Sequence, residues 1–220
     1  MMVRATTSTA EGQTALEPTN HVVLEGVDWQ TYSDLRDQLD RGSRHVKLFY
    51  DNGHLLIEMP NKFHEVVKGF VRALLEAYLI DHDIDYSPLG ATTWKRSKKL
   101  KGLEADECYY IQHADIADRH DEVDLEIDPP PDLAIEVEVT VPLLEKLPIY
   151  AAIGVPELWH LKGWDDVQIL VLDESTMRYN VVSESGAIPG MTASRLRESL
   201  QLRRERSFGE ALKACRVLWR

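Results

Sequence analysis

The chain has 220 residues, of which 44% are hydrophobic, and its 37 acidic and 25 basic residues give a net charge of −12. This size and composition fit one folded domain and exclude a wholly disordered chain, and no apolar run approaches the roughly 20 residues of a membrane-spanning helix. The negative charge counts against tight non-specific binding of DNA, because such binding depends on neutralising phosphates with basic residues.

The two ends of the chain have different compositions from the middle. Residues 1–24 are rich in Thr, Ser and Glu without the apolar block of a signal peptide, so we expect a flexible lead-in. Residues 25–220 are expected to form a single domain with a C-terminal helical tail from Ala193. Cys108 and Cys215 are too few and too far apart for a disulfide framework or a zinc site, which favours a cytoplasmic location.

The first half of the domain predicts a short helix, a hairpin and a long helix. Residues 29–39 are amphipathic, and residues 45–60 alternate around the tight-turn sequence DNG at 51–53, which indicates a β-hairpin. Asn61 is a suitable cap for a helix, and the apolar residues from 63 to 79 recur at helical spacing.

The second half predicts strands with one short helix between them. We expect strands at 85–94, over GLEADECYYI and over DLAIEVEVT, with an acidic loop at 115–128. A helix from Pro142 to about Ile153, capped by Gly154, precedes further strands at 158–161, 167–172 and 178–182. This order predicts an α/β (mixed α+β) domain with a central sheet and parallel pairing across the short helix.

The strand DLAIEVEVT places two carboxylates on one of its faces. Glu136 and Glu138 are two residues apart, so their side chains point the same way and lie roughly 6.6 Å apart. A solvent-facing edge strand would explain the pair. The other face is apolar and the strand leads into a helix, as an interior strand would, and a buried pair of carboxylates favours a hard divalent ion.

Three residues become a candidate site when they are taken together. Asp106 lies in GLEADECYYI, where we expect it on the same face of the strand as Glu104. Lys146 follows Glu136 by ten residues. Taken singly, each is typical of a protein surface. As a set, Asp106 and Glu136 could hold Mg²⁺ or Mn²⁺, while the Lys146 ammonium could orient water and offset charge on a phosphate.

The motifs GLEADECYYI, PPPDLAIEVEVT and EKLPIYAAIGVPELWHL resemble the Uma-type family of restriction-endonuclease-like proteins within the PD-(D/E)XK nuclease superfamily, over roughly residues 29–182. The resemblance implies a restriction-endonuclease-like central mixed sheet flanked by helices, and a metal-dependent endonuclease acting on DNA. It also implies that Asp106 and Glu136 are metal ligands. The usual E-x-K motif would place lysine where this chain has Glu138, so Lys146 is the candidate substitute, and Ala105 stands where the motif usually has proline.

Further residues are weaker candidates. The resemblance implies a histidine, His64, beside the site and a metal-binding glutamate, Glu65, in the first turn of the long helix. Either residue could instead be favoured there by the helix N-terminus alone. Glu138 could act on the reaction through water, and Glu58, at the end of the preceding strand, is the weakest candidate.

A basic run precedes the Asp106 strand and is the best candidate for contacts with DNA phosphates. Trp94 beside it could stack on a base. A run of this kind is equally typical of a solvated loop. Its members are Lys95, Arg96, Lys98, Lys99 and Lys101.

Three functions remain open from the sequence. The first is a Mg²⁺-dependent endonuclease that binds DNA. The second is a non-catalytic nuclease-fold module for nucleic acid or a protein partner, which the absent E-x-K lysine and the negative charge support. The third is a carboxylate-pair hydrolase with another substrate, supported only by the acidic residues. A homodimer is also an expectation, and a membrane partner is not.

Overall fold

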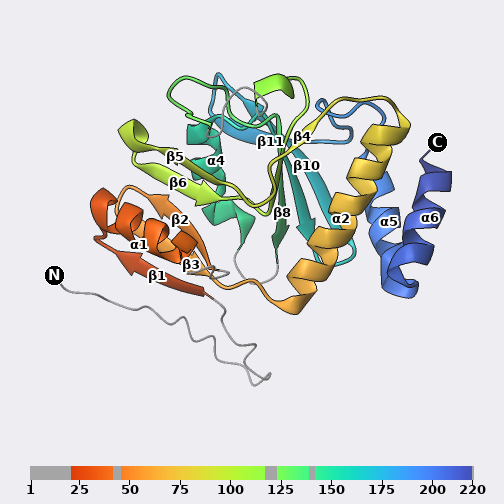
Figure 1. Ribbon diagram of the computed structural model, residues 1–220, viewed down its shortest axis with the longest axis horizontal. Coiled ribbons are helices and arrows are strands. Elements are labelled where there is room, and N and C mark those ends of the chain that lie inside the picture. The colour runs from red at the N-terminus through yellow and green to blue at the C-terminus, as the bar shows by residue number, and fades with distance from the viewer. Residues whose placement is uncertain (1–20, 42–45, 117–122, 139–141, 220) are drawn as a thin grey trace.

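The computed structural model describes residues 21–41, 46–116, 123–138 and 142–219 (Figure 1). Its smaller sheet is antiparallel, with the strand order β1-β3-β2-β6-β5. Helix α1 (Trp29–Arg41) packs on this sheet through a cluster around Tyr32 and Leu48. The strands are β1 (His21–Glu25), β2 (Lys47–Asp51), β3 (His54–Glu58), β5 (Thr93–Arg96) and β6 (Lys101–Glu104).

The larger sheet is mixed and has the order β11-β10-β9-β8-β7-β4. Strands β8 and β9 are parallel, with Glu136 opposite His160, and the other pairs are antiparallel. The predicted parallel pairing across the short helix is confirmed. The strands are β4 (Ser87–Pro88), β7 (Glu107–Tyr110), β8 (Leu133–Glu138), β9 (Glu157–Lys162), β10 (Asp166–Asp173) and β11 (Arg178–Val182).

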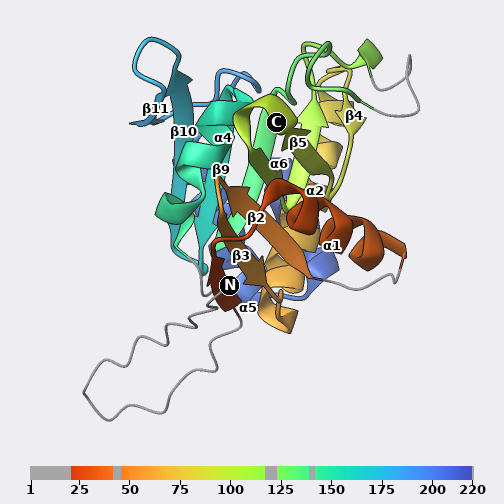
Figure 2. The same cartoon turned by 90° about the vertical axis from the view of Figure 1, so that its left-hand side faces the viewer.

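Helices cover both faces of the larger sheet, which confirms the predicted mixed α/β class with a central mixed sheet. One face packs against α2 (Lys62–Asp81), α5 (Ala193–Glu205) and α6 (Phe208–Leu218), which lie at one end of the molecule (Figure 1). The other face packs against α4 (Leu147–Ile153), which also contacts the smaller sheet. The smaller sheet and α1 lie at the opposite end from α5 and α6 (Figure 1), and they face the viewer when the molecule is seen from that end (Figure 2).

Local sequence signals explain several element boundaries. The Asn61 side chain accepts a hydrogen bond from His64 N at 3.0 Å and caps α2, as predicted. Gly154 ends α4 with φ +94°, a conformation that glycine adopts at little cost. Asn52 and Gly53 both have positive φ in the tight turn between β2 and β3, which confirms the predicted hairpin.

Two predicted strands are wrong, because the chain crosses between the sheets within each of them. The expected strand 85–94 is β4 of the larger sheet followed by β5 of the smaller one, with Gly90 at φ +58° between them. The expected strand GLEADECYYI is likewise β6 followed by β7, and Asp106 lies in the break. Glu104 and Asp106 therefore do not share one face of a single strand.

The chain also departs from its predicted ends. Strand β1 begins at His21, inside the expected lead-in, and pairs with β3; the rest of that segment lies outside the described residues. The predicted C-terminal helical tail is the pair α5 and α6, which packs on the domain. No helix in the described part of the chain has both the length and the apolarity needed to cross a membrane.

Candidate functional site

Glu136 lies at the centre of a buried group of charged side chains between the two sheets. Strand β8 has β7 on one side and β9 on the other, so the interior-strand interpretation is confirmed and the edge-strand one is wrong. Glu136 is 1% exposed; its Oε2 accepts from Lys146 Nζ at 2.9 Å, and its Oε1 accepts from the Tyr150 hydroxyl. Burial raises the pKa of Glu136, but the charges of Lys146 and Lys47 and the hydrogen bonds outweigh it, so the pKa is lowered and the group is a carboxylate.

Lys146 joins the two sheets through its ammonium group. Its Nζ lies 2.8 Å from Glu58 on β3 and 2.9 Å from Glu136 on β8, and 4.2 Å from the centre of the Phe49 ring. Burial lowers the pKa of Lys146, but the charges of Glu136 and Glu58 raise it further, and the net shift is upward. The ammonium is therefore a permanent charge in this part of the protein.

Asp106 occupies the break between β6 and β7 and reaches the neighbouring strand. Its Oδ2 accepts from Val137 N at 2.6 Å, directly after Glu136 in the chain. Its Oδ1 lies 2.7 Å from His64 Nε2 and forms an ion pair with Lys47. The structure thus brings Asp106, Glu136 and Lys146 to one buried place, although they are far apart in the sequence.

The two candidates on α2 lie at different depths. His64 is 4% exposed and connects Asp106, through Nε2, to Glu65, whose Oε1 lies 3.2 Å from Nδ1. Burial, with the nearby charge of Lys47, lowers the pKa of His64 to about 4. The Glu65 side chain is 53% exposed and also pairs with Lys68 at 3.1 Å, so it contacts His64 from the outside. Its role as a metal ligand stays a prediction.

Lys47 is a member of the group that the sequence analysis missed. It is 4% exposed on β2 and pairs with Asp106; burial lowers its pKa to about 8, although the charge of Glu136 raises it. The sequence signal that could have identified Lys47 is its place inside an otherwise apolar strand, two residues before Phe49. Tyr150 was also missed, although it follows Lys146 by one helical turn and therefore shares its face of the helix.

Glu138 lies two residues beyond Glu136 on β8 and has a separate set of partners. Its Oε2 accepts from Leu143 N at 2.8 Å and lies 2.9 Å from His160 Nε2, and its Oε1 lies 2.8 Å from Lys162 Nζ. Within the described residues these three donors belong to the turn that follows β8 and to the parallel strand β9. These contacts do not test whether Glu138 acts on the reaction through water, and that role stays a prediction.

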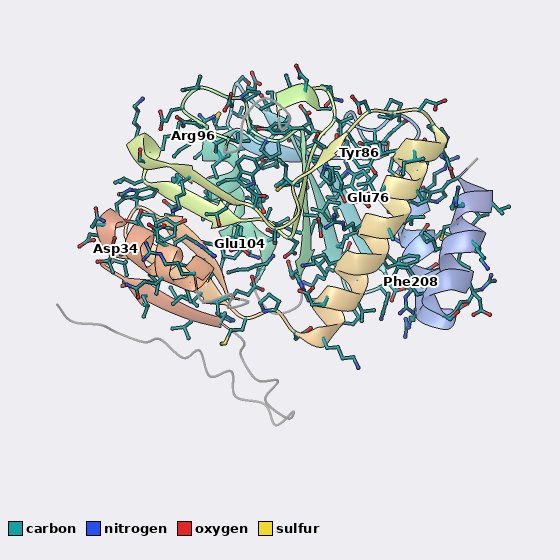
Figure 3. The ribbon with its side chains drawn as sticks, in the orientation of Figure 1. Asp34, Glu76, Tyr86, Arg96, Glu104 and Phe208 are labelled. Carbon is teal, nitrogen blue, oxygen red and sulfur yellow. The ribbon has the colours of Figure 1, made fainter. Side chains whose placement is uncertain are left out.

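The basic run forms the outer end of the β5–β6 hairpin. Arg96 and Glu104 mark the two ends of this hairpin (Figure 3), and Asp106 follows the Glu104 end. Three lysines pair with acidic residues: Lys95 with Asp37, Lys98 with Glu126 and Lys101 with Asp51, while Lys99 donates to the carbonyl of Ala152.

The predicted stacking of Trp94 on a base is wrong. Its side chain is buried, with 2% of its surface exposed, and its indole N–H donates to Cys108 Sγ at 3.2 Å. The alternation of β5 turns Trp94 inward, between the sheets, and leaves the neighbouring Lys95 partly exposed.

The donor set suits a hard divalent cation held in part by the protein. Among the described residues no three Asp, Glu, His or Cys side chains come together as a complete metal cage. Mg²⁺ usually takes one or two carboxylates and completes its shell with water and substrate phosphate. Asp106 and Glu136 are two buried carboxylates, and Asp106 accepts from the amide that directly follows Glu136, so the pair has the number of carboxylates that Mg²⁺ usually takes.

The chain is similar to a protein family and to a solved structure. Residues 29–190, well over half of the chain, match the model of the Uma2 family, which is described as "Putative restriction endonuclease". A crystal structure from Anabaena variabilis ATCC 29413, described as a "putative nuclease belonging to DUF820", is similar with a TM-score of 0.46 and 12% sequence identity. That similarity covers 70% of this chain and 90% of the other. No curated protein matches the chain.

Proposed function

Because the chain belongs to the Uma2 family of restriction-endonuclease-like proteins, we propose that it is a metal-dependent endonuclease that hydrolyses phosphodiester bonds of DNA. The observation that carries this proposal is the buried group of Asp106, Glu136 and Lys146 between the two sheets. The group has three carboxylates and two ammonium groups, an excess of negative charge that a divalent cation would offset. Here Lys146 bridges two carboxylates, and Lys47 serves a third.

In the proposed reaction Asp106 and Glu136 would hold Mg²⁺ or Mn²⁺. When bound, such an ion polarises a phosphate oxygen and makes a coordinated water more acidic. The remaining roles belong to the side chains of the protein. Val137 N and His64 orient the two oxygens of Asp106, and the Tyr150 hydroxyl orients Glu136.

Lys146 supplies positive charge where a phosphate would gain negative charge. Its ammonium is within hydrogen-bond distance of Glu136 and would offset charge that develops on the attacked phosphate. The exposed fractions of Lys146 and Lys47 are only 3% and 4%. Substrate and metal must therefore displace existing ion pairs, so activity requires a local rearrangement of this site.

The basic run is the proposed contact for the DNA backbone. Three of its four lysines are paired with Asp37, Asp51 and Glu126 in the structure, so DNA phosphates would exchange with carboxylates. Such exchange predicts weak binding that depends strongly on salt, in keeping with the net charge of −12. The run comprises Lys95, Arg96, Lys98, Lys99 and Lys101.

A second candidate is a non-catalytic module that keeps the nuclease fold. Two observations favour it: position 138 has glutamate instead of the E-x-K lysine, and the carboxylates of Asp106 and Glu136 are already paired with lysines. This candidate predicts binding to nucleic acid or protein with no dependence on divalent metal.

Cleavage assays separate the two candidates. Supercoiled plasmid and short single-stranded DNA are incubated with the protein in Mg²⁺, Mn²⁺ or EDTA, beside the variants Glu136→Gln and Glu107→Gln. Glu107 is the matched control, because it is also a buried glutamate, on the neighbouring strand β7. We expect metal-dependent cleavage that is lost in Glu136→Gln and kept in Glu107→Gln. A folded wild-type protein that cleaves neither DNA in either metal would contradict the proposal.

A further inference from the structure

We propose that Glu138 is a positioning residue, whose carboxylate fixes the turn that brings Lys146 to Glu136. The inference rests on the proposed function for its catalytic consequence and on the contacts of Glu138 for its structural part. It assigns a purpose to the position at which the chain departs from the E-x-K motif.

The carboxylate of Glu138 is fully engaged by protein donors. Both oxygens are used: Oε2 by Leu143 N and His160 Nε2, and Oε1 by Lys162 Nζ, at 2.8 to 2.9 Å. The Glu138 side chain is 9% exposed. These contacts direct it along the sheet toward β9 and the following turn, whereas Glu136 points to Lys146 and Tyr150.

The contact with Leu143 connects Glu138 to Lys146 in two steps. Leu143 opens the 3₁₀ turn Leu143–Glu145, and an N–H group in the first turn of a helix has no partner within the helix. Glu138 supplies the acceptor that Leu143 N needs. Leu143 O in turn accepts from Lys146 N at 2.8 Å, and Lys146 is the N-cap residue directly before α4.

The turn therefore determines the positions of two groups that reach Glu136. Lys146 lies at the start of α4 and Tyr150 lies one turn later, and both donate to the Glu136 carboxylate. The buried Leu143 side chain packs in the core between α4 and the larger sheet, and this packing also stabilises the turn. A shift of the turn would move both donors together.

A lysine at position 138 could not do this work. An ammonium group has donors only, so it would leave Leu143 N without its acceptor. It would also face the ammonium of Lys162 and the imidazole of His160, which now share the carboxylate. With the proposed catalytic lysine at the N-cap of α4, position 138 needs an acceptor, and this links the glutamate at position 138 to the displaced lysine.

Hydrogen exchange tests the structural part without any need for activity. In Glu138→Ala, we expect the amides of Leu143 and Lys146 to exchange at least about ten times faster, while amides in the middle of α2 keep their protection. Glu138→Gln, which retains one carbonyl acceptor, should show a smaller change, and Glu145→Gln, an exposed residue of the same turn, should show none. Unchanged exchange at Leu143 in Glu138→Ala would overturn the proposal.

A double-mutant cycle on cleavage tests the catalytic part. Glu138→Ala should lower kcat with little change in KM, and should cause a much smaller further loss when Lys146 is already methionine, because only Tyr150 then remains to be displaced. Glu138→Gln should leave the Mg²⁺ concentration for half-maximal activity unchanged, and Glu138→Lys should not restore activity to Lys146→Met. Multiplicative losses, or a tenfold rise in the required Mg²⁺, would make Glu138 an independent catalytic or metal-binding group and overturn the proposal.

The two proposals fail in different ways. If the wild-type protein does not cleave DNA but Glu138→Ala releases the Leu143 amide, the nuclease proposal fails and the positioning role stands. If the wild-type protein cleaves DNA and Glu138→Ala leaves both the amide and kcat unchanged, the nuclease proposal stands and the positioning role fails.

Discussion

Glu136 and Glu107 are buried carboxylates on adjacent strands of one sheet, but the charged groups around them differ. Glu136 faces α4 and receives Lys146 and Tyr150, and its pKa is lowered. Glu107 faces α2, on which Glu76 lies (Figure 3), and its nearest cation is Arg72, 3.6 Å away. Burial raises the pKa of Glu107 more than Arg72 lowers it. Burial of a carboxylate therefore does not distinguish the site, whereas the supply of buried cations does.

We call the side of the larger sheet on which Glu136 contacts Lys146 and Tyr150 the Glu136 face. The largest expected effect comes from removing its cation, Lys146. Lys146→Met would leave Glu58 and Glu136 buried without their shared ammonium, which should cost about 3–5 kcal/mol of unfolding free energy. Urea denaturation measures this loss. Lys162→Met, at a lysine whose side chain is 59% exposed, is the control and should cost no more than about 1 kcal/mol. A loss in Lys146→Met no larger than in the control would show that the pairing contributes nothing.

The next effect concerns metal. If Asp106 and Glu136 hold the ion, Mg²⁺ at a hundred times its dissociation constant should stabilise the folded protein by about 2.7 kcal/mol. Thermal unfolding with and without Mg²⁺ measures this, and EDTA should reverse it. Asp106→Asn should abolish the shift, and Glu107→Gln should retain it. The same Mg²⁺ shift in Asp106→Asn and in the wild type would exclude Asp106 as a ligand.

Glu107→Gln should raise the free energy of unfolding, whereas changes in the Glu136 face should lower it. Because the pKa of Glu107 is raised above its ordinary value of 4.5, the ionised group destabilises the folded state at neutral pH. Stability should fall as pH rises from 4.5 through the raised pKa. At pH 7 the free energy of unfolding of the Gln variant should therefore exceed that of the wild type by about 1 kcal/mol. Below pH 4.5 the two proteins should be equally stable. Denaturation at both pH values tests this, and a destabilised variant at pH 7 would contradict it.

The smallest effect belongs to the basic run. Lys98→Ala removes an exposed charge, so stability should not change, and DNA binding should weaken a few-fold with a salt slope shallower by about one. Titrations of labelled DNA at several salt concentrations measure the slope. Arg178→Ala, on the exposed strand β11, is a control outside the run. Equal slopes for the wild type and Lys98→Ala would place the DNA contact elsewhere.

Local patterns predicted the elements whose signals are periodic. Helix α2, the β2–β3 hairpin and strand β8 follow from apolar spacing and turn residues, and the family motifs pointed to Asp106, Glu136 and Lys146, which the structure brings together. The roles of those residues remain proposals.

The crossings between sheets could not be predicted in this way. Strands of two to four residues, such as β4 and β7, carry little pattern of their own, and their partners are decided by tertiary packing. Lys47 and Glu58 were underrated for the same reason. Their hairpin is evident in the sequence, but its contacts with Asp106 and Lys146 depend on the packing of one sheet against the other.

The most direct test is the single-turnover rate of DNA cleavage in Mg²⁺ for Glu136→Gln and Glu107→Gln, each measured beside the wild type. The two variants make the same chemical change in buried glutamates on adjacent strands. We predict that Glu136→Gln loses at least about a thousandfold in rate, equivalent to about 4 kcal/mol of transition-state stabilisation. Glu107→Gln should stay within a few-fold of the wild type. Equal rates for the two variants would contradict the assignment of the site to the Glu136 face.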